Sequence, residues 1–195
     1  MSKCIIGTLI VGAILIAIAA LIVVEFGLMP ANADATPPAL ERWAATTALH
    51  KAIQRQAPTE ADPLAINEDN LTAGMKIYGA NCVFCHGGAD GAPSDIAKGL
   101  YQKPPQLAEH GVEDDPAGHT YWKVSHGIRW TGMPAFGDVL SDEEIWQVTL
   151  FLKHMDSLPP GAEAAWQELP RYSVGPEAPV GAQGSPVATP TPTFG

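Results

Sequence analysis

The stretch "NCVFCHGG", residues 81–88, places two cysteines on either side of two residues, with a histidine directly after the second cysteine. Three chemistries use this pattern: a redox dithiol, a zinc site and a covalently attached haem. Each of them needs a different fold and different additional ligands. The rest of the sequence therefore decides among them.

Composition limits the class of protein. The chain has 195 residues, of which 46% are hydrophobic, and this is enough for one ordinary domain with extensions. Its net charge of −10 argues against nucleic acid as a partner. Only three cysteines occur, and Cys4 lies far from the other two, which excludes a framework of disulfide bonds.

The N-terminal segment is long and apolar. Residues 5–24 carry no charge and are rich in Ile, Leu, Val and Ala, a length that spans a bilayer as a helix. Lys3 precedes the segment and favours a cytoplasmic N-terminus with an exported remainder. A cleaved signal peptide is the alternative, because "ANA" at 31–33 fits the small-residue cleavage pattern. Both interpretations export the rest of the chain.

Changes in composition predict four segments. Residues 1–30 form the transmembrane anchor or signal, and 31–63 form a linker that contains a helix at 39–57. Residues 64–159 form the folded domain. From 160 to 195 the sequence is biased towards Pro, Gly and Ala, which predicts a disordered tail.

Within the folded domain, helical patterns predict an all-α fold with long loops. One helix is expected at about 70–82 and a second at about 119–126. A third begins at Ser141, which forms a capping box with Glu144 three residues later. Few residues alternate with the period of a strand, so we expect no sheet.

The dithiol and zinc interpretations of the motif are weak. A thioredoxin-like dithiol is expected within a βαβ pattern, which the sequence lacks. A zinc ion needs four ligands, and His110 or His119 would have to join Cys82, Cys85 and His86. However, the adjacent Cys85 and His86 cannot easily reach one tetrahedral ion together.

Haem fits the motif best. Cys82 and Cys85 can each form a thioether to one edge of a porphyrin, and His86 can then face the iron as the proximal ligand. Covalent attachment suits an exported protein, which would otherwise lose its cofactor. The long loops of 83–118 and the small apolar core also suit a domain built around something other than side chains.

Met133 is the predicted distal ligand of the iron. Pro134 disfavours helical conformation at Met133, and Gly132 and Gly137 allow the loop to approach a flat ligand closely. The remaining methionines lie in the export segment or in or beside predicted helices. His126 is the main competitor for the distal position.

These motifs closely resemble the class I cytochrome c family in its single-haem bacterial form. The resemblance rests on "AGMKIYGANCVFCHG" at 73–87, "KVSHGIRWTGMPAFGD" at 123–138 and "LSDEEIWQVTLFLKHM" at 140–155, in the order of the family. It implies an all-α cytochrome c fold around one covalent haem c, with His86 and Met133 as the axial ligands of the iron.

The resemblance also implies contacts of the haem and its proximal ligand. In the family, the carbonyl of a proline accepts a hydrogen bond from the proximal imidazole. Pro93 is the candidate here, and Pro104 and Pro105 are alternatives. Arg129 and Trp130 are placed to reach the haem propionates.

A helix crossing is a further implication of the resemblance. The first and last helices of the domain would cross at close contact, where Gly74 and Tyr78 would meet Val148 and Phe151. Such a contact would explain a glycine within the helix 70–82, because glycine lowers the stability of a helix interior.

The expected function is electron transfer without substrate chemistry, in a bacterial respiratory or dehydrogenase chain. The alternatives are a fixed haem subunit of a larger membrane oxidoreductase complex, or a haem enzyme or gas sensor if Met133 is not a stable ligand. Residues 64–159 contain 13 acidic and six basic side chains, which predicts redox partners with a basic docking patch. The predicted location is the bacterial inner membrane, with the cytochrome domain on the periplasmic side.

Overall fold

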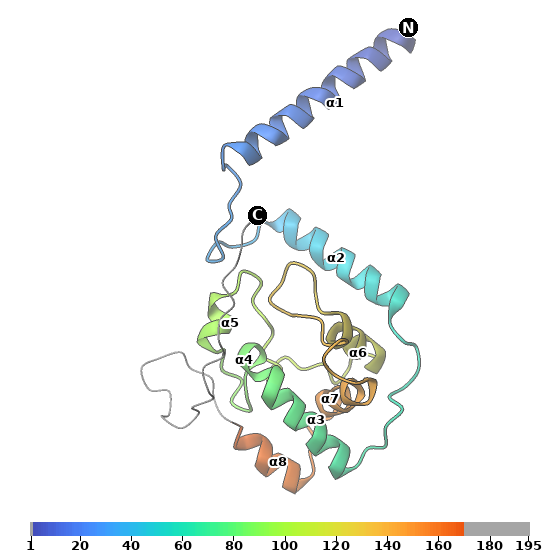
Figure 1. Ribbon diagram of the computed structural model, residues 1–195, viewed down its shortest axis with the longest axis vertical. Coiled ribbons are helices and arrows are strands. Elements are labelled where there is room, and N and C mark those ends of the chain that lie inside the picture. The colour runs from blue at the N-terminus through green and yellow to red at the C-terminus, as the bar shows by residue number, and fades with distance from the viewer. Residues whose placement is uncertain (1, 170–195) are drawn as a thin grey trace.

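The computed structural model describes residues 2–169, and this part of the chain is helical without strands (Figure 1). The prediction of an all-α fold is therefore confirmed. The helices are α1 (Ser2–Glu25), α2 (Ala39–Gln56), α3 (Glu68–Asn81), α4 (Val83–His86), α5 (Asp95–Gly99), α6 (Ala117–His126), α7 (Asp142–Lys153) and α8 (Pro160–Gln167).

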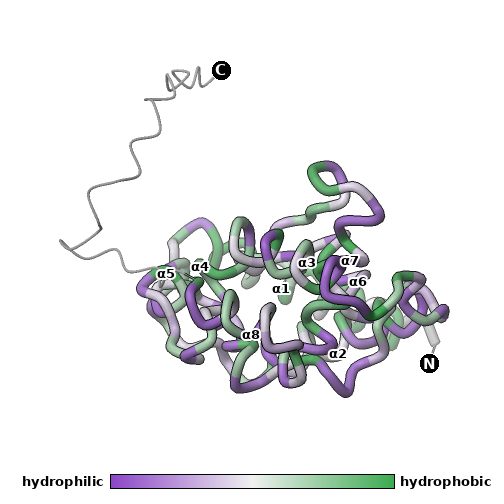
Figure 2. Tube along the Cα trace, turned by 90° about the horizontal axis from the view of Figure 1, so that it is seen from below, coloured by the Kyte–Doolittle hydropathy of each residue, from purple (hydrophilic) through white to green (hydrophobic). Residues whose placement is uncertain are grey.

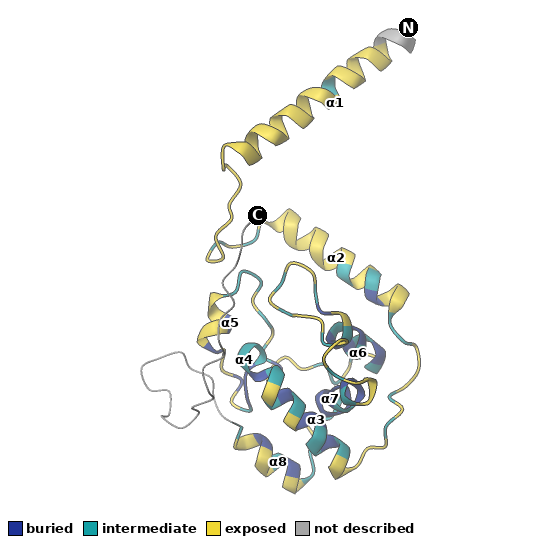
Figure 3. Cartoon of the chain, in the orientation of Figure 1, coloured by how far each residue is buried: buried dark blue, intermediate teal, exposed yellow. Residues whose placement is uncertain are grey.

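The N-terminal helix α1 has no buried face over residues 5–25. Its span Ile5–Glu25 is long and apolar enough to cross a membrane, and none of it is buried in the protein (Figure 3). Large apolar side chains such as Leu9 and Ile16 are more than two-thirds exposed. A helix that is hydrophobic all round is stable only in an apolar environment. The expectation of an anchor or signal is consistent with this exposure.

The centre of the domain is the packing of α3 against α7 (Figure 1). A Cβ atom at Gly74 would lie 2.0 Å from the carbonyl oxygen of Gln147 and 2.9 Å from the Cβ atom of Phe151. The rings of Tyr78 and Phe151 meet one turn away, with their centroids 5.6 Å apart. Glycine at position 74 therefore allows the two backbones to approach closely, as the family resemblance implied.

Amphipathic helices build this core. Hydrophobic and hydrophilic residues are interspersed along the helices (Figure 2). The buried side chains of α3 and α7, such as Tyr78, Val148 and Phe151, belong to one core cluster. Helix α7 begins with the predicted capping box: the Ser141 side chain accepts from the Glu144 backbone N–H, and the Glu144 carboxylate accepts from the Ser141 backbone N–H. Helix α6 ends at Gly127, whose positive φ of 64° suits glycine.

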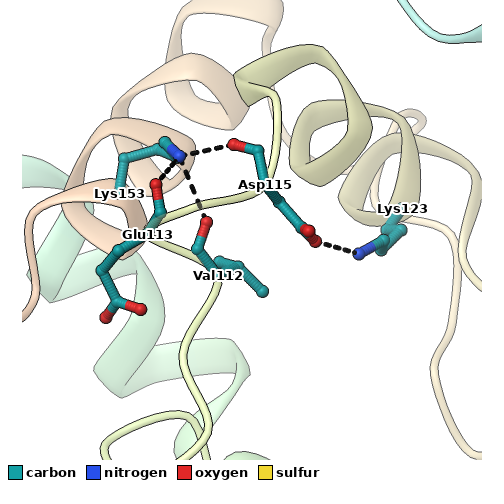
Figure 4. Close-up of polar contacts among 5 residues, drawn as sticks. All are labelled: Val112, Glu113, Asp115, Lys123 and Lys153. Carbon is teal, nitrogen blue, oxygen red and sulfur yellow. Dashed lines mark hydrogen bonds and ion pairs between the residues drawn. The ribbon is translucent and has the colours of Figure 1, made fainter.

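A lysine fixes the long loop before α6. The ammonium group of Lys153, in the last turn of α7, donates to the carbonyl oxygens of Val112, Glu113 and Asp115 (Figure 4). The carboxylate of Asp115 forms an ion pair with Lys123, with an N–O distance of 3.0 Å. The loop is thus attached to α7 on one side and to α6 on the other.

The prediction of disorder from residue 160 onwards is wrong for its first part. Residues Pro160–Gln167 form α8, with proline in the first turn, where its missing N–H costs nothing. Trp166 is 3% exposed, and its ring makes edge contacts with Tyr78 and Phe151. One large apolar residue therefore attaches this segment to the core despite its composition. Residues 170–195, the rest of the predicted tail, lie outside the described residues.

Helix α2 confirms the helix expected at 39–57. Its C-terminal half packs on α6, where Ile53 is buried. Its N-terminal half, residues 39–48, is exposed throughout (Figure 3).

Candidate functional site

The cysteine motif forms a single tight turn at the end of α3. Cys82 ends α3 and begins α4, and its carbonyl oxygen accepts from the backbone N–H groups of Cys85 and His86, at 3.1 and 2.9 Å. Gly87 then ends the turn with a φ of 75°. The short spacing in the sequence therefore brings the two thiols and the imidazole to one corner of the domain.

These three side chains line a cavity of about 160 Å³ that is partly open to solvent. Met133, from the loop between α6 and α7, lines the same cavity. The apolar side chains of the wall come mostly from that loop, from α6 and from the loop after α5. They include Leu100, Pro104, Pro105, Val124, Ile128 and Phe136.

A backbone carbonyl orients the imidazole of His86. Its Nδ1 atom lies 2.9 Å from the carbonyl oxygen of Pro105. Burial lowers the pKa of His86, and the hydrogen bond to Pro105 opposes this only in part. The imidazole is therefore neutral at pH 7, with the proton on Nδ1 and the lone pair of Nε2 free to bind a metal. The expectation that Pro93 supplies this carbonyl is wrong, because the carbonyl group that contacts the imidazole belongs to Pro105.

The thiols are not activated as nucleophiles. Burial, and then the proximity of Cys85, raises the pKa of Cys82 to about 12, and burial also raises the pKa of Cys85. Both groups are therefore protonated at neutral pH. Redox-active dithiols have the opposite property, a lowered pKa. The dithiol interpretation is therefore disfavoured.

The zinc interpretation lacks ligands. Among the residues that the structure describes, no three His, Cys, Asp or Glu side chains form a group suited to one metal ion. The cavity instead combines thiol, imidazole and thioether groups with apolar walls.

Hydrogen bonds within the loop place Met133. The Met133 carbonyl oxygen accepts from the Ile128 backbone N–H at 3.1 Å, and the Met133 backbone N–H donates to the Thr131 hydroxyl at 3.1 Å. The Thr131 hydroxyl in turn donates to the Ile128 carbonyl oxygen at 2.7 Å. The side chain of Met133 is half-buried and packs against the core. The loop therefore holds the thioether in the cavity wall.

The other predicted site residues do not line the cavity. Arg129 and Trp130 are exposed, and Trp130 is 90% exposed at a φ of 63°. The competitor His126 stacks on the ring of Trp122, with centroids 4.9 Å apart. Of the two predicted distal ligands, only Met133 shares the cavity with His86.

The donor set fits a haem with two thioether attachments. The two neutral thiols lie in one helical turn, and the adjacent imidazole has a free Nε2. The thioether of Met133 lies in the wall of the same apolar cavity. The sequence did not identify Leu100, Val124 and Phe136 as residues of the cavity wall. The one signal in the sequence that could have indicated their role is their apolar character.

Comparison with known families supports this assignment. Residues 69–152 match the family model "Cytochrome C oxidase, cbb3-type, subunit III", which describes a c-type cytochrome domain. The match extends from the first turn of α3 into the last turn of α7 and includes the whole site. No curated protein shows significant sequence similarity to the chain.

Proposed function

From the premise that residues 69–152 are a c-type cytochrome domain with a covalently bound haem c, we propose that this protein is an electron carrier. In this proposal Cys82 and Cys85 hold the haem through thioethers, and His86 and Met133 are the axial ligands. The observation that carries the proposal is the convergence of these four side chains on one cavity.

When bound, the haem supplies a one-electron couple between ferrous and ferric iron. The residues of this chain set its environment. The Pro105 carbonyl fixes the orientation and tautomer of His86. A thioether ligand and apolar walls both favour the ferrous state over the ferric state, which raises the reduction potential. With both axial positions filled, the site suits electron transfer rather than the binding of oxygen.

We propose an inner-membrane location with the cytochrome domain on the periplasmic side. The apolar, exposed span of α1 supports membrane attachment, and Lys3 before it favours a cytoplasmic N-terminus. Redox partners with a basic docking patch would complement the acidic domain. Their electron-transfer rates should then fall as salt is added. Rates that do not change with ionic strength would contradict this choice of partner.

A fixed haem subunit of a larger membrane oxidoreductase is the second candidate. The description of the matching family, a subunit of a cbb3-type oxidase, favours it. Mild detergent extraction followed by purification separates the two candidates. A carrier would purify alone, whereas a subunit would purify in a constant ratio with other polypeptides.

Carbon monoxide tests the ligand set directly. The absorption spectrum of the full chain, produced in haem-attaching cells, should be c-type and should not change when carbon monoxide is added to the reduced protein. The Met133→Ala variant should bind carbon monoxide. The Met75→Leu variant, a matched control in the core away from the cavity, should not.

Binding of carbon monoxide by the unmodified protein would show an open iron and favour a haem enzyme or gas sensor. A protein without haem would overturn the whole proposal.

A further inference from the structure

The first half of α2 exposes two large apolar side chains on one side of the helix. Leu40 is 73% exposed and Trp43 is 65% exposed, and their spacing of three residues places them next to each other. The contact of α2 with the domain is made further along, where Leu49 and Ala52 are half-buried and Ile53 is buried. The domain therefore leaves this apolar pair uncovered.

The chain keeps this pair close to any membrane that α1 spans. Thirteen residues separate Glu25 from Ala39. Fully extended, they would reach at most about 47 Å, at up to about 3.6 Å per residue. They begin with further exposed apolar side chains: Phe26 is 75% exposed, and Leu28 and Met29 are 66% and 65% exposed. Apolar surface is thus found at both ends of the linker.

The charge of α2 differs from that of the rest of the protein. Its basic residues Arg42, Lys51 and Arg55 outnumber its single acid, Glu41, whereas the whole chain has a net charge of −10. The carboxylate of Glu41 accepts a hydrogen bond from the Tyr101 hydroxyl at 2.9 Å. The one acidic group of the helix is therefore engaged by the domain. Arg42 remains exposed beside Trp43, and Lys51 and Arg55 are exposed further along, in the half of α2 that packs on α6.

We propose that the N-terminal half of α2 lies in the headgroup layer of an anionic bilayer, with Leu40 and Trp43 inserted. Tryptophan and leucine beside basic side chains are typical of helices that bind at this depth, where the bilayer takes up the apolar groups and its phosphates attract the cations. The proposal rests on the membrane attachment through α1 proposed above.

This docking would orient the haem cavity. Tyr101, which binds Glu41 of α2, lies in the loop that supplies Leu100, Gln102 and Pro105 to the cavity wall. A docked α2 would therefore hold this wall at a fixed position relative to the membrane surface. The protein would present its cavity to membrane-bound partners instead of moving freely on the linker.

The test measures the depth of α2 with a spin label on the full haem-loaded chain in vesicles of phosphatidylcholine and phosphatidylglycerol. Cys4→Ser removes the N-terminal cysteine, and Thr47→Cys carries a nitroxide on the Trp43 side of α2. Ala164→Cys, exposed on α8, carries the control label. We compare how often the nitroxide collides with oxygen, which concentrates in lipid, and with a water-soluble nickel chelate. The haem of the protein is kept reduced in both measurements.

We expect a higher ratio of oxygen to nickel accessibility at Thr47 than at Ala164. The ratio should fall to the Ala164 value when Leu40→Ser and Trp43→Ser are combined, while flotation shows that the protein stays on the vesicles. Vesicles of phosphatidylcholine alone should give a smaller ratio at Thr47, because the basic side chains lose their anionic partners.

Equal ratios at Thr47 and Ala164 in anionic vesicles would overturn the proposal. Shielding of Thr47 from both reagents, in detergent as well as in vesicles, would also overturn it and would indicate a protein contact. Protein that fails to float would contradict membrane attachment and with it this inference, whereas the absorption spectrum of the same sample reports independently on haem binding and the electron-carrier proposal.

Discussion

The buried hydroxyl of Tyr78 donates to the carbonyl oxygen of Gly87, 2.7 Å away. This hydrogen bond joins the core helix α3 to the residue that ends the turn with Cys85 and His86. Burial raises the pKa of Tyr78, so the hydroxyl keeps its proton over the whole ordinary pH range. The helix packing and the haem-binding turn are thus connected through one side chain.

We predict that Tyr78→Phe lowers the free energy of unfolding by about 1–3 kcal/mol, because it leaves the Gly87 carbonyl oxygen without its partner in a buried place. Guanidinium unfolding of the haem-loaded protein measures the change. Tyr101→Phe is the matched control, since its bond to Glu41 is exposed, and we expect a change below about 0.5 kcal/mol. Equal losses in the two variants would contradict the role of the buried bond.

The close approach of α3 and α7 gives a second prediction. A Cβ atom at Gly74 would lie 2.0 Å from a backbone oxygen of α7, which cannot move without displacing that helix. Gly74→Ala should therefore destabilise the protein by about 1–3 kcal/mol, despite the better helix propensity of alanine. Gly99→Ala, where nothing lies within 4 Å of the new atom, should leave the stability unchanged or slightly higher. Thermal unfolding followed by circular dichroism compares the two variants.

Local signals in the sequence predicted much of this structure. The capping box of Ser141 and Glu144 depends on residues three positions apart, and α7 begins where the sequence predicted it. The crossing at Gly74 followed from a family resemblance rather than from helix propensity.

Local signals of this kind could not predict contacts between residues far apart in the sequence. The carbonyl partner of His86 is 19 residues away, and the path of the intervening loop decides between Pro93 and Pro105. Helix α8 was missed because its composition is typical of disorder, while its stability comes from the burial of Trp166 against aromatic rings distant in the sequence.

The burial of Trp166 predicts that α8 contributes to the stability of the protein. Trp166→Ala removes a ring whose centroid lies 5.5 Å from that of Tyr78 and 5.4 Å from that of Phe151. We expect a loss of about 3–5 kcal/mol in the free energy of unfolding, typical of a large buried aromatic residue. Trp130→Ala should change it by less than about 0.5 kcal/mol, because Trp130 is 90% exposed. Similar effects at the two positions would show that α8 is not packed on the core.

The capping box predicts a dependence on pH. Ser141→Ala should cost about 1 kcal/mol at pH 7. Hydrogen bonds from the Ser141 backbone and side chain lower the pKa of Glu144 in the folded protein. The stabilisation by the Glu144 carboxylate is therefore present above its unfolded pKa, and is lost as the pH falls through its folded pKa.

Urea unfolding of the wild-type protein and the Glu144→Gln variant, at several values between pH 7 and pH 3, measures this effect. The wild-type protein should lose its advantage over the variant as the pH falls. An advantage that stays constant down to pH 3 would contradict the assignment to the ionised carboxylate.

The loop that holds Met133 depends on Gly127. A Cβ atom at Gly127 would lie 2.7 Å from the carbonyl oxygen of Met133 and 2.6 Å from the carbonyl carbon of Pro134, and the φ of 64° disfavours any residue with a side chain. Gly127→Ala should therefore displace Met133 from the cavity wall. In the proposed haem site, the reduced variant should bind carbon monoxide at concentrations that leave the wild-type protein unchanged.

Gly137→Ala is the control for this prediction. Gly137 lies at the other end of the same loop, where φ is not in the left-handed region and the nearest atom to a new Cβ, the Ser125 Oγ, is 3.0 Å away. This variant should keep Met133 in place and resist carbon monoxide. If Gly127→Ala also resists carbon monoxide while its unfolding free energy falls, the strain must be absorbed elsewhere in the loop, and Gly127 would not control the position of the distal ligand.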